Sequence, residues 1–170
     1  MAYDTKKLSG LLHWSRRSGS NFDMRYWVAK EPCGTVMCLA GKTILDAGYS
    51  VDWEAINAGD NGIRICEKDG TPWSIQDAAR FELGLKEKEA DQLFTPDLHD
   101  QVREAIEDDQ FPDTGKIQDM ESRMAFDFLC YLVARARHRR ANLSGPEVAM
   151  WAESWALVHD ESLSEAYLRE

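Results

Sequence analysis

The sequence has no run of apolar residues long enough to cross a membrane. Its longest mostly apolar segment, Met124 to Ala136, is interrupted by Asp127 and Arg135 and falls short of the roughly 20 residues that a spanning helix needs. The first seven residues also lack the apolar stretch of a secretory signal. We therefore expect a protein without membrane contact that works in the cytoplasm of a bacterium or of an infected host cell.

Cofactor fingerprints and known catalytic motifs are also missing, as are internal repeats and any linker that would separate two domains. We accordingly assign no catalytic residue, no cofactor and no metal ligand, and favour a protein that is not an enzyme. With 170 residues, of which 44% are hydrophobic, the chain is long enough to bury one core without disulfides. A single domain over residues 1–170 is the prediction.

Basic residues are scarce relative to acidic ones. There are 20 Lys and Arg against 30 Asp and Glu, which gives a formal charge of −10. Residues 51–110 hold 16 of the acids and 6 of the bases, so this segment forms an acidic pole. Such a charge distribution favours encounter with a basic protein surface and disfavours direct binding to nucleic acid.

Helical periodicity dominates the chain, so we predict a mainly α fold. The first helix is expected from Asp4 or Thr5 to Ser15, and a nearly all-apolar one from Thr35, as N-cap, to Ala47, with Gly48 ending it. Further helices are predicted after Ser74, over 86–94, after Thr95, over 117–137 and after Ser144. The 117–137 helix is apolar on most faces and is our choice for the centre of the core.

A small β element is expected in the middle of the chain. Residues 49–73 contain the alternating stretch Ile63–Glu67 followed by the turn residues Asp69 and Gly70, a pattern typical of a β-hairpin. The two helices after it, up to residue 94, invite comparison with a DNA-binding helix pair. Three acids in the second helix argue against that use, and packing on the core is favoured.

The string from Cys33 to Cys38 is the most distinctive motif. Its thiols are most simply explained as small reduced side chains that pack a turn. Two alternatives stay open: Cys33 as a nucleophile at a helix N-terminus, and a metal site that adds Cys66 and a distant histidine. We designate as the structural motif Cys33, Gly34, Thr35, Cys38 and Gly41.

Residues 20–95 resemble a family of small bacterial and phage proteins through the string C-G-T-x-x-C-x-A-G, together with Ala78-Ala79 and Leu83-Gly84-Leu85. In that family the position of Met37 is often His and that of Lys42 often Trp, so this chain departs from the pattern at two sites. The resemblance implies no established activity, only an association with mobile elements.

Two groups of residues are candidate partner contacts. One is a basic cluster at the end of the 117–137 helix, for which the favoured interpretation is that it complements the negative end of that helix and the alternative is contact with a phosphate or an acidic partner. The other is a tryptophan pair on one face of the last helix, which is more often core than surface. The candidate residues are Arg135, Arg137, Arg139, Arg140, Trp151 and Trp155.

These observations favour an interaction protein, plausible for a phage or other mobile element, that binds and modulates a host or defence protein. A homo-oligomer is compatible with the same features. One alternative is a cysteine-dependent or metal-assisted enzyme centred on Cys33. Another is a nucleic-acid-binding regulator or, in the opposite sense, an acidic mimic of nucleic acid.

Overall fold

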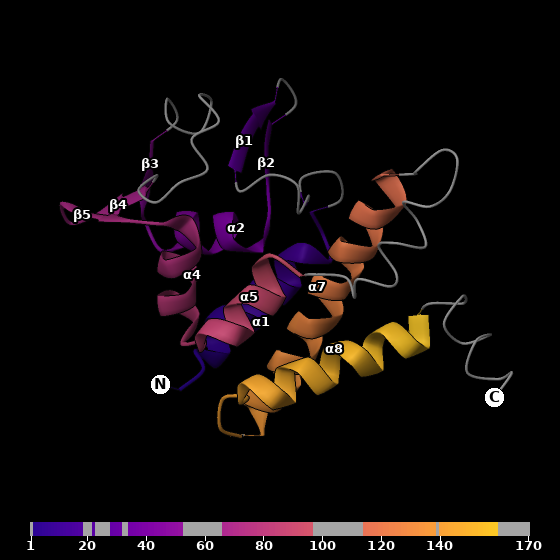
Figure 1. Ribbon diagram of the computed structural model, residues 1–170. Helices are drawn as coiled ribbons and strands as arrows, with labels where there is room; N and C mark the ends of the chain where they lie inside the picture. The colour runs from indigo at the N-terminus through magenta and orange to yellow at the C-terminus, as the bar shows by residue number, and fades with distance from the viewer. Residues whose placement is uncertain are drawn as a thin grey trace, which may run out of the picture.

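The computed structural model describes residues 2–18, 22, 28–31, 34–52, 66–96, 114–138 and 140–159. Within them the protein is mainly helical with small antiparallel β elements, which confirms the predicted fold class. The helices are α1 (Thr5–Ser15), α2 (Leu39–Asp46), α4 (Ile75–Leu83), α5 (Glu87–Phe94), α7 (Thr114–Arg137) and α8 (Gly145–His159). Helices α1 and α5 lie between α2 and α4 on one side and α7 and α8 on the other (Figure 1). In the described part of the chain, no helix is both long and apolar enough to span a membrane.

The ends of the helices follow the signals in the sequence. Asp4 caps α1 by accepting a hydrogen bond from the backbone N–H of Lys7 at 2.9 Å. Ser74 caps α4 in the same way. Ser144 and Glu147 form a reciprocal capping box at the start of α8. These contacts satisfy N–H groups that have no partner inside the helix, and they confirm the predicted starts.

Helix α7 supplies the middle of the core, as predicted. Its buried face packs against α1 and α5, and Phe128 lies with its ring centroid 4.6 Å from that of Trp151 on α8. One continuous cluster of buried side chains draws on all six described helices. The buried residues of α7 are Met124, Ala125, Phe128, Leu129, Leu132, Val133 and Ala136.

The predicted hairpin is present and carries a third strand. Strand β4 (Cys66–Lys68) pairs with β5 (Thr71–Trp73) across a turn in which Asp69 and Gly70 both have positive φ, the backbone that a tight hairpin requires. Strand β3 (Ser50–Val51) adds to the other edge of β4. The predicted strand residues 63–65 and the predicted helix after Pro96 lie outside the described residues.

The predicted helix start at Thr35 is wrong. Residues Gly34–Met37 form strand β2, which pairs with β1 (Val28–Glu31) in register Glu31 to Gly34, and α2 begins only at Leu39, with Cys38 as its N-cap. Thr35 and Val36 are β-branched and so favour a strand over the first turn of a helix. The predicted helix stop is correct, since Gly48 has φ +80° directly after the last turn.

Candidate functional site

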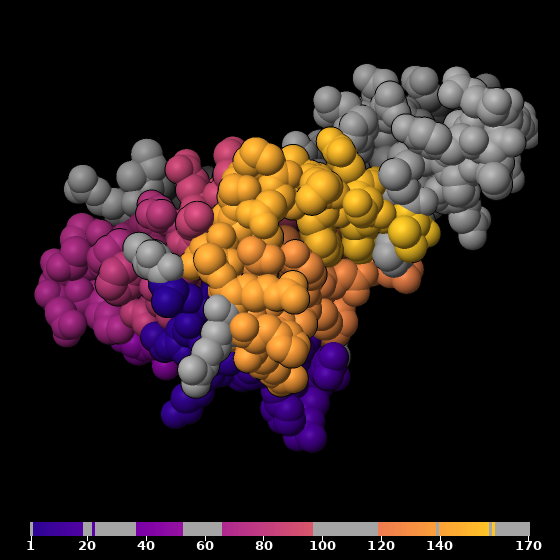
Figure 2. Space-filling view, turned by 90° about the horizontal axis from the view of Figure 1, so that it is seen from below, coloured from indigo at the N-terminus to yellow at the C-terminus, as the bar shows by residue number. Residues whose placement is uncertain are grey.

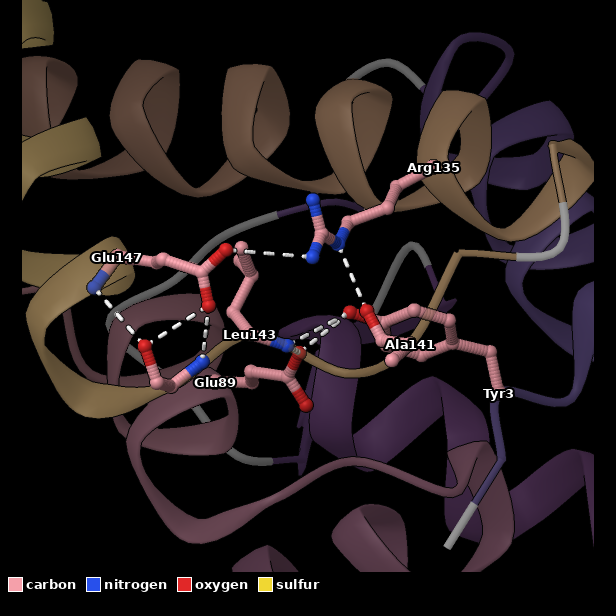
Figure 3. Close-up of polar contacts among 7 residues, drawn as sticks. Tyr3, Glu89, Arg135, Ala141, Leu143 and Glu147 are labelled. Atoms are coloured by element: carbon pink, nitrogen blue, oxygen red, sulfur yellow. Dashed lines mark hydrogen bonds and ion pairs between the residues drawn. The ribbon is translucent and has the colours of Figure 1, made fainter.

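The most deeply buried charged group in the described structure is the carboxylate of Glu89, which has no exposed surface. Its Oε1 accepts from the Tyr3 hydroxyl at 2.5 Å and from the backbone N–H of Leu143 at 2.6 Å. Its Oε2 accepts from the backbone N–H of Lys86 and from Asn142 Nδ2, both at 2.8 Å. Figure 3 shows Tyr3, Glu89 and Leu143 converging from three separate parts of the chain.

A carboxylate accepts about four hydrogen bonds, and all four places on Glu89 are taken by the protein itself. Burial, together with the hydrogen bond to Glu89, raises the pKa of Tyr3, which keeps its hydroxyl a donor. Asn142 uses its second N–H on the carbonyl of Gly84 at 2.8 Å. The Glu89 carboxylate therefore has no free acceptor position for a metal or a substrate. Its role is to join the N-terminal segment, α5 and the loop before α8.

A second layer of contacts lies beside this network. Arg135 Nε donates to the carbonyl of Ala141 at 2.8 Å, and Arg135 Nη2 lies 3.4 Å from a carboxylate oxygen of Glu147 (Figure 3). The hydrogen bonds from Ser144 lower the pKa of Glu147, so its carboxylate stays charged opposite the guanidinium. Both contacts fix the turn between α7 and α8, and they engage the first residue of the predicted basic cluster.

A cavity of about 440 Å³ opens where the first half of α1 faces the C-terminal ends of α2 and α4. Apolar groups dominate its walls. The charged lining residues have solvent-exposed side chains and so mark its rim. The lining residues are Asp4, Lys6, Lys7, Gly10, Leu11, Thr43, Asp46, Ala47 and Leu83. Its size lies within the range of small-molecule sites.

A partly buried ion-pair cluster adjoins this cavity at Glu82, the neighbour of Leu83. The Glu82 side chain is only 8% exposed and pairs with Lys7 and with Lys68, the latter at 2.9 Å, while the Tyr49 hydroxyl donates at 3.1 Å. Burial by itself raises the pKa of Glu82, but these partners outweigh it and lower the pKa to about 2. In turn, burial and the contact with Glu82 raise the pKa of Tyr49 to about 12. Glu82 is therefore ionised at neutral pH, and its contacts hold α1, α4 and β4 together.

Helix α8 has apolar residues on both sides. Its inner face buries Val148, Trp155 and Ala156, whereas Met150 is 61% and Val158 77% exposed. Figure 2 shows α8 as a ridge lying on the surface of this side of the molecule. Residues 145–159 contain two glutamates and neither lysine nor arginine. We call the outward-facing residues Pro146, Ala149, Met150, Glu153, Ser154 and Val158 the α8 outer face.

The described residues of the predicted cysteine motif belong to different elements. Gly34 and Thr35 belong to β2, Cys38 is a buried residue before α2, and Gly41 is buried within α2. Cys33, on which the nucleophile and metal alternatives depend, lies outside the described residues.

Among the described cysteines, Cys66 and Cys130 are free thiols. Burial raises the pKa of Cys66 to about 11, so that thiol is a poor nucleophile at neutral pH. Its sulfur lies 3.4 Å from the carbonyl of Trp73 and packs in the core cluster. Within the described ranges, no three His, Cys, Asp or Glu side chains gather in a way that could hold a metal ion.

The arginines and tryptophans predicted as partner contacts differ in their exposure. Arg137 and Arg140 are exposed at the end of α7, whereas Arg135 is engaged as described above and Arg139 lies outside the described residues. Trp155 is buried and donates its indole N–H to Asp127 at 2.9 Å. Trp151 is partly buried against Phe128. Both tryptophans are placed as core residues, with Trp151 at the edge.

Two of the residues described above, one in the Glu89 network and one on the cavity wall, carry signals that are visible in the sequence. Glu89 stands three positions after Lys86 at a predicted helix start, which is the place of the acid in a capping box. Gly10 interrupts a helical pattern where no turn is needed. By contrast, nothing in the sequence pairs Glu82 with Lys7 and Lys68, because those residues are brought together only by packing. Comparison with protein-family models, with curated proteins and with solved structures found no match.

Proposed function

We propose that this is a non-enzymatic interaction protein, and that the α8 outer face binds an apolar groove with a basic rim on a second protein and thereby modulates it. The observation that carries the proposal is the exposure of Met150 and Val158 on a helix whose opposite face is already fully used in the core. A helix that is apolar all round is normally buried. Pro146 and Met150 stand four positions apart, and Met150 and Val158 eight apart. These exposed apolar residues therefore share one side of the helix, as the anchors of helix-in-groove recognition do.

Charge supports the basic rim. The α8 outer face carries Glu153 and no cation, and the whole chain has a formal charge of −10. Attraction between surfaces of opposite charge speeds encounter and selects among apolar grooves that are otherwise alike. The partner that we propose is a host or defence protein, the class expected from the sequence.

The described part of the acidic pole contributes less negative charge to the surface than its sequence suggests. Of its described acids, Glu82 and Glu89 are consumed by internal contacts. The remaining ones are Asp52, Glu67, Asp69, Asp77, Glu87 and Asp91, and they stand among Lys68, Arg80, Lys86 and Lys88. This mixed surface favours binding through α8 over binding through an acidic mimic of nucleic acid.

A pull-down from bacterial lysate with immobilised protein tests the proposal. Wild type is expected to retain specific proteins that Met150→Lys fails to retain, because a lysine in an apolar groove weakens binding by roughly tenfold or more. Met150 is exposed, so this substitution should change the free energy of unfolding by no more than about 0.5 kcal/mol.

Phe81→Lys is the matched control. Phe81 is an apolar side chain on α4 with a similar exposure of 56%, and its replacement should leave the retained proteins unchanged. Retention of the same proteins by Met150→Lys as by wild type would contradict the proposal. A wild-type dimer in light scattering that Met150→Lys converts to a monomer would replace it with self-association.

A further inference from the structure

We infer that the cavity between α1, α2 and α4 is a binding site for a small amphipathic anion, meaning an apolar body that carries one carboxylate, sulfonate or phosphate. This inference is independent of the α8 outer face, because the cavity residues come from other helices. It starts from the balance of charges around the cavity.

The charged groups that line the cavity are Asp4, Lys6, Lys7 and Asp46. Lys7 is committed to Glu82 and lies 3.8 Å from Asp4, and Asp4 also caps α1. Asp46 is paired with Lys42 on its own helix. Lys6 is exposed and has no ion-pair partner among the residues that the structure describes. One positive charge, that of Lys6, is therefore left at the rim of the cavity, in the first turn of α1.

Gly10 gives a second reason to expect a ligand. A glycine inside a helix costs about 1 kcal/mol of stability relative to alanine. At Gly48, Gly70 and Gly84 the positive φ explains why glycine is present. Gly10 has no positive φ, and a Cβ built on it would meet nothing within 4 Å. No described side chain requires a glycine there. A bare backbone on a cavity wall is the arrangement that lets a bound molecule approach a helix closely.

The apolar part of the ligand would lie against Gly10, Leu11, Ala47 and Leu83, and its anionic group would lie at the rim near Lys6. Leu11 and Leu83 are buried core residues, so this end of the cavity is a fixed wall. The Glu82 cluster holds the same wall, because it ties Lys7 on α1 to the last turn of α4. The site is thus preformed, which limits the ordering that binding requires.

Two fluorescent dyes with the same body test the inference on the native, full-length chain. 1-Anilinonaphthalene-8-sulfonate carries a sulfonate, and N-phenyl-1-naphthylamine lacks it. Wild type is expected to bind one sulfonate dye per chain, and to bind it about two- to fivefold more tightly than the neutral dye, the range for one charge pair at a solvent-exposed rim. Lys6→Gln should bring this ratio close to one.

Gly10→Phe should weaken binding of both dyes by at least tenfold, because its ring occupies the cavity. The variant is expected to fold, since its Cβ has open space and phenylalanine is a better helix former than glycine. His13→Phe places the same ring on α1 outside the cavity lining and should leave binding unchanged, as should Met150→Lys on α8. Unaltered binding in Gly10→Phe would overturn the inferred site. Equal affinity of wild type for the two dyes would overturn the preference for an anion.

Discussion

Replacing Glu89 by glutamine is the sharpest test of how this fold is held together. The change keeps the shape of the side chain and replaces one acceptor oxygen by an NH₂ group. In the native structure both oxygens receive two donors each, so the new NH₂ must face at least one group that can only donate. The best orientation puts it toward Tyr3, whose hydroxyl can turn and accept, and leaves the N–H of Leu143 with only the Tyr3 oxygen, at 3.3 Å, as its acceptor.

The cost follows from these contacts. Losing the short contact of the Leu143 N–H costs up to the roughly 1–3 kcal/mol of a fully unsatisfied group, and each hydrogen bond that changes from a charged to a neutral acceptor loses about 1 kcal/mol. The neutral amide no longer requires burial of a charge, which offsets part of the loss. We expect Glu89→Gln to lower the free energy of unfolding by about 2–4 kcal/mol, which corresponds to a decrease in Tm of roughly 5–15 °C for a chain of this size.

Urea unfolding at pH 7, followed by circular dichroism, measures this difference. Glu87→Gln is the matched control: it makes the same chemical change in the same first turn of α5, on an exposed side chain, and should stay within about 0.5 kcal/mol of wild type. Tyr3→Phe combined with Glu89→Gln should show a coupling energy of at least about 0.5 kcal/mol, because the two groups share a hydrogen bond. If Glu89→Gln were as stable as Glu87→Gln, the structural role of the network would be refuted.

Three further predictions concern other parts of the fold. Glu82→Gln should lower the free energy of unfolding at pH 7, and by progressively less as the pH falls from about 4.5 towards 2. The reason is that the pKa of Glu82 in the folded state, about 2, lies below its ordinary value of 4.5, so the stabilisation by the ionised carboxylate is lost through that range. If urea unfolding showed the same difference between variant and wild type at pH 7 and at pH 3, this prediction would be wrong. Gly84→Ala should lower the free energy of unfolding, measured thermally, by at least about 1–2 kcal/mol more than Gly48→Ala does. Both glycines have positive φ, but only at Gly84 would a Cβ lie 2.0 Å from the carbonyl oxygen of Ala2. Equal losses for the two variants would mean that this close approach is absent. Gly10→Ala should stabilise the protein without ligand by about 0.5–1 kcal/mol, because its Cβ meets no neighbour, and a fall in Tm would show that the cavity wall is tighter than described.

Sequence periodicity and capping residues predict most of this fold because both act over a few residues. Asp4, Ser74 and Ser144 are side chains that satisfy backbone groups three positions away, so the chain needs no tertiary information to use them. The same holds for Gly48 and Gly84, where the backbone conformation admits few other residues. The apolar pattern over 117–137 was equally informative, since a helix with that much apolar surface has to be central.

The wrong prediction at Thr35 shows where local reasoning fails. Threonine is a good N-cap and an equally good strand residue, and the apolar run after it fits either structure. Pairing of Gly34–Met37 with Val28–Glu31 decides between them, and that pairing is a contact between two segments rather than a property of one. The same limit applies to Arg135, which the sequence groups with neighbouring cations and the structure places against Ala141 and Glu147.

The candidate site was harder to predict than the fold because its charges are defined by their partners. Counting acids in residues 51–110 treats Glu82 and Glu89 as surface charges, yet Glu89 is fully buried and the Glu82 side chain is only 8% exposed. Their burial becomes evident only when Lys7, Lys68 and Tyr3 are brought in from distant positions. A count of charges over a segment therefore overestimates the field that a partner would meet, and the difference is largest where the fold uses carboxylates internally.

The Glu89 network also bears on the proposed binding role of α8. Leu143 directly precedes the capping residue Ser144, and its N–H is fixed by a carboxylate on α5. The direction in which α8 leaves the core is therefore set by Glu89 and Tyr3 at its base, and by the hydrogen bond from Trp155 to Asp127 further along. Tyr3→Phe touches nothing on the α8 outer face but loosens its base. If α8 binds as a rigid, preorganised helix, this variant should weaken retention of the partner in proportion to the ordering that binding then has to supply. If instead the partner itself aligns α8, Tyr3→Phe should leave retention unchanged while Met150→Lys still abolishes it.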